Sequence, residues 1–375
     1  MWSFSRFVLA GFVAVRVGAA QSPAEKLIEA GHWKQARAFV EARMRDDPKD
    51  ALAHYLLSQI RHAFGDTDSP APLAERAVAI DSGVAKYHRQ LAEVLGVKAQ
   101  HSGMLQQLLL ARRFKKEIDT AIGLDPRDLQ SLRDLMEFYL LAPAIVGGDK
   151  SKAAQIAGQI ARIDPSEGFS AQARLAAFHG DHGQVEGLLR KAVECGPAAP
   201  YRARIALANF YLSGGRANLD GAEQQASQAV KIDRGRVDAY AVLAQIYAAR
   251  SQWADLDTLL TNAEKAVPDD LVPNYRAANA LLESNRALDR AVTYFRKYTN
   301  AEPEGNRPPV SEARWKLGRA LEKLGRKAEA EAEWRESIRL DRNSPAQQDL
   351  KRMRGQWELR AAPISESSGA SRIGS

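Results

Sequence analysis

The chain is 375 residues long, carries a formal net charge of +7 and contains a single cysteine, Cys195. This length exceeds what one hydrophobic core usually organises, so either several domains or an array of repeats is expected. A single cysteine excludes an internal disulfide and a cysteine-based metal site. The positive charge is small and spread along the sequence, whereas nucleic-acid-binding proteins cluster their basic residues on one surface.

The N-terminal residues have the layout of a secretory signal peptide. A short positive segment with Arg6 precedes an apolar run over residues 7–17, and small residues follow up to Ala20. The run has roughly half of the ~20 residues that a membrane-spanning helix needs. We therefore predict a signal peptide over residues 1–20, cleaved after Ala20, an exported, periplasmic product, and no stable membrane span in the mature chain. Arg16, inside the run, leaves an uncleaved anchor or an atypical signal open as alternatives.

A recurring phrase closes successive segments of the chain: a helical stretch rich in small and apolar residues, then an Asp-Pro pair or a degenerate relative of it. The phrase occurs nine times, at intervals that average about 37 residues. Its closing positions are Pro48, Ser82, Pro126, Pro165, Pro197, Arg234, Pro268, Pro303 and Arg342. Such a period predicts an array of similar units stacked side by side.

The clearest unit runs over residues 237–270. Its first half places apolar and aromatic residues on one helical face at i, i+3, i+4 and i+7 spacing, namely Tyr240, Leu243, Ala244 and Tyr247. Its second half does the same with Leu256, Leu260 and Ala263. Pro268 ends the second half because proline lacks an amide donor. The unit is therefore predicted to be two antiparallel helices.

These residues resemble the pattern of the tetratricopeptide repeat (TPR) family, whose period is about 34 residues. The first and last units repeat the pattern with Leu27, Gly31, Trp33, Ala36 and Pro48, and with Trp315, Leu317, Gly318, Leu321, Gly325, Ala330, Trp334 and Ser337. The resemblance implies an all-α fold, an α-solenoid in which antiparallel helix pairs form a right-handed superhelix. It also implies that the concave groove of the solenoid binds a protein or peptide.

The period divides the chain into about nine units, a cap and a tail. The units are expected over roughly residues 22–49, 51–84, 85–127, 129–166, 167–198, 201–235, 237–270, 271–304 and 309–343. A helix over residues 344–359 is expected to cap the array, because a terminal repeat must cover its exposed apolar face. Residues 360–375 are rich in Ser and Gly and are predicted to be disordered.

Three segments break the period. Residues 97–124 are predicted to form one lengthened helix, and residues 142–150 an unusually apolar loop. Residues 304–309 are rich in Gly, Pro and Asn and predict a plain connecting loop that acts as a hinge. The lengthened helix with its apolar loop resembles a feature of exported bacterial TPR proteins of unassigned role, which implies a bacterial cell-envelope protein.

Two short motifs are candidate ligand sites. The Gly147–Ser151 segment opens a helix, where amide groups can hold a phosphate, but it lacks the P-loop spacing, and Asp149 is better suited to capping that helix. His179, Asp181 and His182 offer three potential metal ligands at a helix turn, where polar residues are also common for conformational reasons. The sequence contains no nucleophile motif such as Gly-x-Ser-x-Gly. No catalytic residue, metal or cofactor is therefore predicted.

The densest basic cluster is residues 112–116, which contain Arg112, Arg113, Lys115 and Lys116 around Phe114. On a protruding helix these cations could meet anionic lipid, polysaccharide or nucleic acid. Phe114 falls on the buried face of the predicted helix, which favours the simpler interpretation of a solvated helix surface.

The remaining candidate site is the concave groove, lined by outward positions of each first helix. By register these include Tyr55, Gln59, Arg89, Arg133, Asn209, Gln245, Arg276, Trp315 and Arg319. Arginines and aromatic residues are favoured anchors at interfaces. The alternative is a hydrated groove in which Arg89 pairs with Glu93, and Arg133 with Glu137, at i, i+4 spacing.

The leading hypothesis is a non-catalytic, periplasmic scaffold that binds a protein or peptide, with no nucleic-acid partner. An RNA-binding helical repeat is the first alternative, because repeats of similar length that read single strands also stack helix pairs. A cryptic metal-dependent hydrolase at His179 and His182 is the second alternative.

Overall fold

The computed structural model describes residues 22–195, 201–213, 218–305 and 308–361. The predicted signal peptide and the predicted tail from residue 362 onward lie outside these residues. The described residues form nineteen α-helices, one short 3-10 helix and no strand, and the predicted all-α fold is confirmed.

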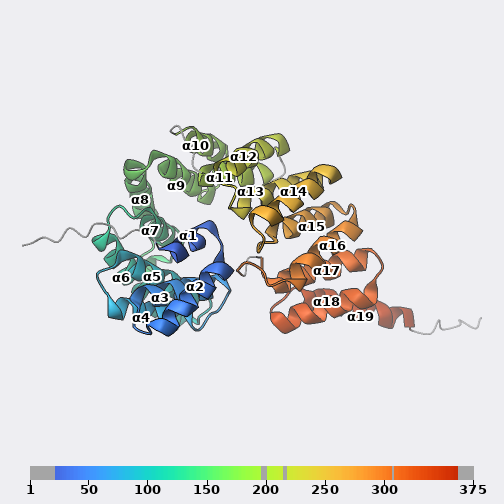
Figure 1. The fold of residues 1–375 in the computed structure, drawn as a ribbon, viewed down its shortest axis with the longest axis horizontal. Helices are drawn as coiled ribbons and strands as arrows, with labels where there is room; N and C mark the ends of the chain where they lie inside the picture. Colours follow the sequence, from blue (N-terminus) through green and yellow to red (C-terminus); the bar gives the residue numbers. More distant parts are fainter. Residues whose placement is uncertain (1–21, 196–200, 214–217, 306–307, 362–375) are drawn as a thin grey trace, which may run out of the picture.

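The helices follow one another as antiparallel pairs (Figure 1). The pairs are α1 (Pro23–Ala30) and α2 (Trp33–Asp46), α3 (Ala51–Ala63) and α4 (Pro70–Ile80), α5 (Ala85–Gln100) and α6 (Met104–Leu124), α7 (Leu129–Leu141) and α8 (Lys150–Ile163), α9 (Pro165–Phe178) and α10 (His182–Glu194), α11 (Tyr201–Leu212) and α12 (Leu219–Ile232), α13 (Val237–Ala249) and α14 (Trp253–Ala266), α15 (Val272–Ser284) and α16 (Leu288–Asn300), and α17 (Val310–Lys323) and α18 (Lys327–Leu340). The last helix, α19 (Ala346–Ala361), packs on α18.

The Asp of the recurring Asp-Pro phrase ends the second helix of most pairs. In five pairs this Asp has extended backbone angles, and its side chain accepts a hydrogen bond of 2.9–3.0 Å from the amide two residues later. The residues are Asp47, Asp81, Asp125, Asp233 and Asp341. This local turn offers the chain an alternative to another helical turn, so the phrase marks the boundary between neighbouring units.

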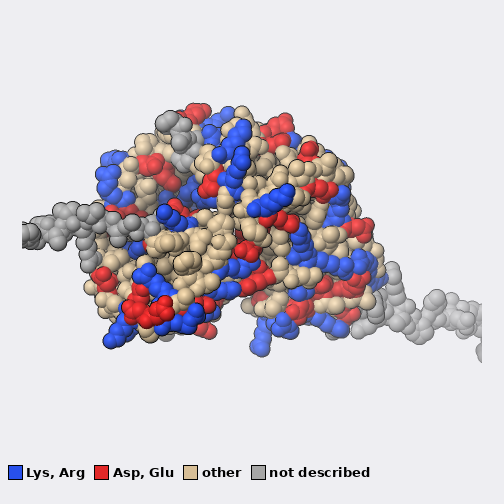
Figure 2. Space-filling model, viewed as in Figure 1, with Lys and Arg blue, Asp and Glu red and all other residues tan. Residues whose placement is uncertain are grey.

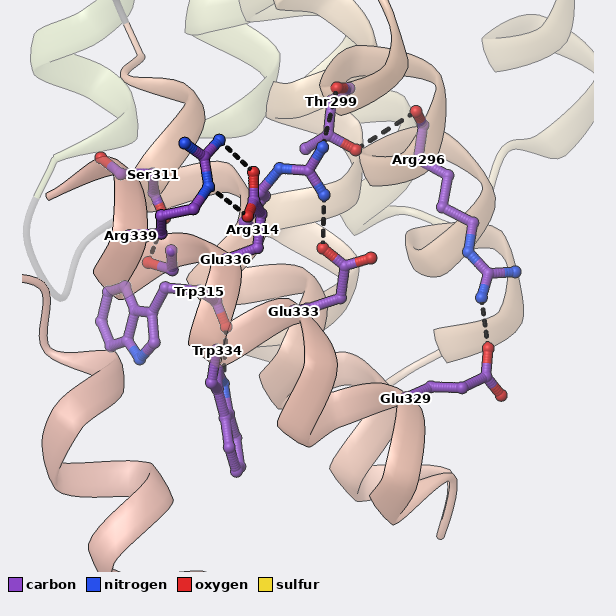
Figure 3. Close-up of polar contacts among 11 residues, drawn as sticks. Arg296, Thr299, Ser311, Arg314, Trp315, Glu329, Glu333, Trp334, Glu336 and Arg339 are labelled. Carbon is purple, nitrogen blue, oxygen red and sulfur yellow. Dashed lines mark hydrogen bonds and ion pairs between the residues drawn. The ribbon is translucent and has the colours of Figure 1, made fainter.

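Small residues let the helices of a pair pack closely. In the clearest unit, the predicted faces of both helices are buried except for Tyr247, which is half-buried, and Ala244 and Leu256 are fully enclosed. In the last unit, the indole of Trp334 lies against the backbone of Gly318 and donates a hydrogen bond of 3.1 Å to the carbonyl of Trp315 (Figure 3). A large buried ring on α18 therefore requires a residue without a side chain on α17.

Polar contacts between units recur at the spacing of the repeat. Arg133 pairs with Glu167, 34 residues later, and Arg296 pairs with Glu329, 33 residues later (Figure 3). The indole of Trp315 donates to Asp349 of the capping helix, 34 residues later, at 2.7 Å. Equivalent positions of successive units are neighbours in space, so polar pairs between units add to the apolar packing at these junctions.

The prediction of one helix over residues 97–124 is wrong. Helix α5 ends at Gln100, and α6 begins at Met104 after a turn. The ring of His101 contacts the carbonyl of Val97 at 2.9 Å, and the hydroxyl of Ser102 donates to the carbonyl of Lys98 at 2.7 Å. These local bonds satisfy the last carbonyls of α5, and Gly103 then adopts an extended conformation before α6.

The predicted apolar loop has structure of its own. Residues Ala144–Val146 form the 3-10 helix η1, and Gly147 follows in the left-handed region with φ of 103°. Val146 is buried, whereas Ile145 points to solvent. Gly148 is required by packing, because a Cβ there would lie 1.8 Å from the carbonyl oxygen of Ala142.

The solenoid curves until its two halves meet. In Figure 1, α1 and α2 lie close to the connection between α16 and α17, on the inner side of the arch. Odd-numbered helices contact one another along much of the chain, for example α13 with α15 and α15 with α17, so they line the inner surface. The curvature thus brings together residues about 270 positions apart.

Gly318→Ala is expected to destabilise the protein. A Cβ at this position would lie 2.3 Å from Nε1 of Trp334, so the ring or a helix must shift. Overpacking of this kind costs about 1–3 kcal/mol of the free energy of unfolding, which urea unfolding followed by circular dichroism measures. Gly187→Ala in α10 is the matched control, since its Cβ meets no atom within 4 Å. An equal loss of stability in both variants would contradict the role given to Gly318.

Candidate functional site: the concave cavity and its closure

The inner surface of the arch forms a cavity of about 670 Å³, open to solvent, where its two halves meet. The end of α1 and the start of α2 form one wall, and α13, α15 and α17 form the other. Side chains that line it include Trp33, Asp238, Asp270, Tyr275, Arg276, Asn279, Glu304, Glu312 and Lys316. We call this space the concave cavity.

A hydrogen-bond network fixes one wall of the concave cavity. The hydroxyl of Tyr275 donates to Glu312 at 2.7 Å, and the ammonium of Lys316 donates to that hydroxyl at 2.8 Å and to Asn279 at 2.7 Å. Burial opposes ionisation of Glu312, but hydrogen bonds from Lys316 and Tyr275 outweigh it and hold the pKa of Glu312 below its ordinary value. This wall is therefore charged and rigid.

Arg276 differs from its neighbours in this wall. Its side chain is exposed to the concave cavity, and it makes no hydrogen bond or ion pair with any residue that the structure describes. Lys316, one unit further on, is paired with Glu312 at 2.9 Å. Arg276 thus offers an unused set of hydrogen-bond donors to a ligand.

The closure of the arch depends on Glu304. Helix α2 has no hydrogen bond from a capping side chain of its own at His32, which leaves its first amide groups without an acceptor. The carboxylate of Glu304 accepts a hydrogen bond of 2.6 Å from the amide of Lys34, in the first turn of α2. A residue 270 positions away therefore caps this helix.

Lys34 and Arg37 add further bonds to the same contact. The ammonium of Lys34 donates to the carbonyls of Asp269 at 3.1 Å and Glu302 at 2.9 Å. The guanidinium of Arg37 donates to both oxygens of Glu302, at 2.9 and 3.2 Å. Glu304 and Gly305 are buried against α2 and α3, so the prediction that residues 304–309 form a plain hinge loop is wrong at these two residues.

Two carboxylates at the closure have raised pKa values. Burial raises the pKa of Glu304 to about 7; the amide and the charge of Lys34 oppose the rise, while Asp270 and Asp269 add to it. Burial likewise raises the pKa of Asp270 to about 6, against a hydrogen bond from the amide of Val272. The closed arch therefore favours protonation of both groups.

The predicted groove residues do not form one continuous site. Arg276 lines the concave cavity, and Gln59 lines a smaller space of about 170 Å³ beside Glu304. Asn209 is exposed on α11, Gln245 is half-buried on α13, and Arg319 stacks over the ring of Trp315. Tyr55 is buried against Tyr87, at 5.1 Å between ring centroids, so the prediction that it faces the groove is wrong. A ligand role for the others stays a prediction.

The predicted pairing of groove charges is half correct. Arg89 lies 3.3 Å from Glu93, as expected for an i, i+4 pair. Arg133 instead pairs with Glu167 at 2.8 Å, and Glu137 accepts two hydrogen bonds of 2.8 Å from Arg174. The prediction for Arg133 and Glu137 is wrong because partners on the next unit offer better geometry than a partner on the same helix.

The sequence did not point to several residues of the concave cavity. Trp33, Asp238 and Lys316 lie outside the register used for the groove, and Glu304 lies in a presumed loop. For Lys316 a signal existed, since Glu312 precedes it by four residues on one helix. No sequence signal links Glu304 to α2, because contacts over 270 residues follow only from the overall curvature.

The two short motifs have structural roles. Asp149 accepts hydrogen bonds from the amides of Ser151 and Lys152, which occupies the donors that a phosphate would need and confirms its predicted capping role. Asp181 caps α10 through the amide of Gln184. Within residues 22–195 and the other described ranges, no group of three or more His, Cys, Asp and Glu side chains is arranged to hold a metal ion.

Two of the four cations of the basic cluster at residues 112–116 form ion pairs. Arg113 pairs with Glu75 at 2.7 Å and Lys115 with Asp119, while Phe114 is buried as predicted. Over the face shown in Figure 2, cations and anions are interspersed. Of the helices described, none is long and apolar enough to cross a bilayer.

Solved structures with a similar fold include two helical-repeat proteins. Human IFIT1, solved as a dimer with m7Gppp-AAAA, has a similar structure with 14% identity and a TM-score of 0.47, over 90% of this chain and 80% of its own. TTC0263, a thermophilic TPR protein of Thermus thermophilus, is 21% identical with a TM-score of 0.37, over 56% of this chain and 100% of its own. No family model matches the sequence, and neither does any curated protein.

The described residues form an α-solenoid of antiparallel helix pairs. Such repeat folds are typical of proteins that bind other macromolecules through an extended surface. At these identities and TM-scores the likeness says nothing about the ligand, which is inferred from the cavity itself.

The closed arch is expected to become more stable as the pH falls from 8 to 6. Glu304 has a folded pKa of about 7, above its ordinary value of 4.5, so the folded state is destabilised wherever the unfolded chain ionises this group more readily, and this cost falls as the pH drops from 8 towards 4.5. Because the cost changes by about one pKa unit between pH 8 and pH 6, the expected effect of Glu304 over this range is about 1.4 kcal/mol.

Urea unfolding of the wild-type protein and of Glu304→Gln, at both pH values, tests this expectation. The Gln side chain keeps an acceptor for the Lys34 amide but does not titrate, so the variant should lose most of the pH dependence. Asp270, whose pKa is about 6, should supply the remainder. An identical pH dependence in both proteins would refute the assignment to Glu304.

Proposed function

We propose that the protein is a non-catalytic scaffold that binds a protein or peptide segment in the concave cavity. The observation that carries the proposal is Arg276, an exposed guanidinium that makes no hydrogen bond or ion pair with the described residues, set in a cavity of about 670 Å³. Tyr275, Asn279 and Lys316 hold the surface around it in a fixed arrangement. An anchoring arginine on a rigid wall is typical of residues that dominate binding energy at interfaces.

The chemistry of the cavity suits a polypeptide with at least one carboxylate. Arg276 can bind a carboxylate through two parallel hydrogen bonds. The exposed carboxylate of Asp238 can accept hydrogen bonds from backbone amides of the same ligand. Trp33 supplies an aromatic surface on the opposite wall. A long polyanion such as RNA is less suited, because Asp238, Asp270 and Glu312 face the same space.

We further propose that the protein acts outside the cytoplasm, in the bacterial cell envelope. The support is the sequence alone: a positive N-terminal segment, an apolar run over residues 7–17 and small residues up to Ala20.

Arg276→Ala is expected to weaken ligand binding about tenfold, the usual cost of losing a charge-assisted hydrogen-bond pair at an anchor. A photo-crosslinking residue at Asn279, in the native host, should trap a specific protein, and Arg276→Ala should reduce the yield. Arg45→Ala, on the exposed face of α2, is the matched control and should leave the yield unchanged.

Two results would contradict the proposed ligand. An equal yield at Asn279 in the Arg276→Ala and Arg45→Ala variants would remove the concave cavity as a binding site. If ribonuclease digests the trapped material, the ligand of the concave cavity is RNA and not a peptide.

The location is tested separately. Protein isolated from the host should be recovered in the periplasmic fraction, with Gln21 as its first residue. Recovery from the cytoplasm with residues 1–20 intact would contradict export, without bearing on the concave cavity.

A further inference from the structure

A second apolar surface lies at the edge of the solenoid, where two departures from the repeat meet. The α5 and α6 pair is the longest of the described pairs, with helices of 16 and 21 residues, and the connection between α7 and α8 contains η1. Helix α6 and η1 are in contact. Between them lies a groove of about 320 Å³, which we call the α6–α7 groove.

The floor and walls of the α6–α7 groove are apolar. Phe114 and Phe138 stack at 5.1 Å with an interplanar angle of 16°, and Val97, Leu108 and Val146 surround them. The volume falls within the range of ligand pockets. Because these side chains line an open space rather than a closed core, a partner that filled the groove would remove apolar surface from water.

Exposed apolar side chains extend along the elements that form the groove. On α6, these are Met104, Leu105 and Leu109, and at the end of α7 and in η1 they are Leu141 and Ile145, all between 58% and 80% exposed. They make up half of the large apolar side chains that are exposed in the described residues, on three neighbouring elements, α6, α7 and η1. Such clustering marks an interaction surface, whereas scattered single residues would not.

One rim of the groove is acidic. Glu93, Asp134 and Glu137 line it, and among the described residues only two guanidinium groups pair with them: Arg89 with Glu93 at 3.3 Å and Arg174 with Glu137 at 2.8 Å. Arg89 also forms a longer ion pair of 3.6 Å with Oδ2 of Asp134, and the ring of His62 lies 3.8 Å from Glu93. Three carboxylates therefore share two guanidinium groups, and Asp134 has the longest of these ion pairs.

Oδ2 of Asp134 is a buried acceptor without a hydrogen bond from any described residue, whereas Oδ1 accepts from Gln130 at 3.0 Å. Burial raises the pKa of Asp134 to about 6. The positive charge of Arg89 opposes this rise, and the negative charge of Glu93 adds to it. A buried polar atom left unpaired costs free energy, so a ligand that supplies a donor here gains more than one at an exposed carboxylate.

We infer that the α6–α7 groove is a docking site for an amphipathic segment of a partner protein, one that places large apolar side chains on Phe114 and Phe138 and a Lys or Arg side chain at Asp134. The apolar floor sets the first requirement, and the excess of carboxylates over guanidinium groups, with an Asp134 oxygen that accepts no hydrogen bond, sets the second. The site is separate from the concave cavity and does not depend on the function proposed for it.

Two other occupants fit the same surface less well. Anionic lipid would suit the exposed cations Arg112 and Lys116 on α6, but it would meet the three carboxylates that line the groove itself. A second copy of the chain, docked through the same face, would bring the excess carboxylates of two rims together.

Selection of random 12-residue peptides on the full chain tests the inference. The selected sequences should share two or more large apolar residues at i, i+3 or i+4 spacing and one Lys or Arg. Fluorescence anisotropy then measures the affinity of a synthetic consensus peptide. Leu141→Glu should weaken binding at least tenfold, whereas Ile232→Glu, an exposed apolar residue on α12, should not change it.

Asp134→Asn tests the charge separately from the fold. It should lower the affinity for the consensus peptide about fivefold to tenfold. The affinity for a version of the peptide with Gln in place of its Lys or Arg should change by less than about twofold. Arg276→Ala should leave both affinities unchanged. If Arg276→Ala abolishes binding, the peptides occupy the concave cavity, which overturns the groove but not the proposed function.

Two results overturn the inference. One is a selection that enriches no consensus combining large apolar residues with a Lys or Arg. The other is a consensus peptide that binds Leu141→Glu and the wild-type protein with equal affinity. Co-sedimentation with phosphatidylglycerol vesicles that is lost in Leu105→Ser would assign the surface to lipid instead. A dimer in light scattering that Leu141→Glu dissociates would assign it to a second copy.

Discussion

The contact between Glu304 and the first turn of α2 decides the shape of the inner surface. A solenoid without such a contact is open, and its concave face is a long shallow groove. Here the amide of Lys34 is capped by a carboxylate from the other half of the chain, and the ammonium of the same residue holds the carbonyls of Asp269 and Glu302. The groove is thereby divided into a larger and a smaller cavity, both lined by Glu304.

The repeat itself could be predicted because its causes are local. A capping Asp, an Ala at each close approach and a large apolar residue at i, i+3 or i+4 act within one helix pair. They place Ala244, Leu256 and Trp334 in the core, where the structure has them. The turn at His101 to Gly103 could not be predicted in the same way, because side-chain hydrogen bonds to the last carbonyls of α5 end that helix while the apolar spacing continues.

The candidate sites were harder to predict because they depend on partners outside the unit. Arg133 and Glu137 each choose a partner on the next helix pair, so the i, i+4 rule failed there and held for Arg89. Glu304 looked like part of a flexible connection, since Gly, Pro and Asn surround it. Its burial depends on the summed curvature of the earlier units, which no local pattern encodes.

Closure and ligand binding share residues, so each must influence the other. Glu304 and Asp270 line the concave cavity and also carry the raised pKa values of the closure. A ligand that brings a positive charge near them favours their ionised forms, whereas a ligand carboxylate near them favours protonation. Thermodynamic linkage then makes the affinity of the cavity depend on pH in the direction set by the charge that the ligand places beside these two carboxylates. The α6–α7 groove lies between other helices and does not include Glu304 or Asp270 in its lining, so its affinity is free of this coupling.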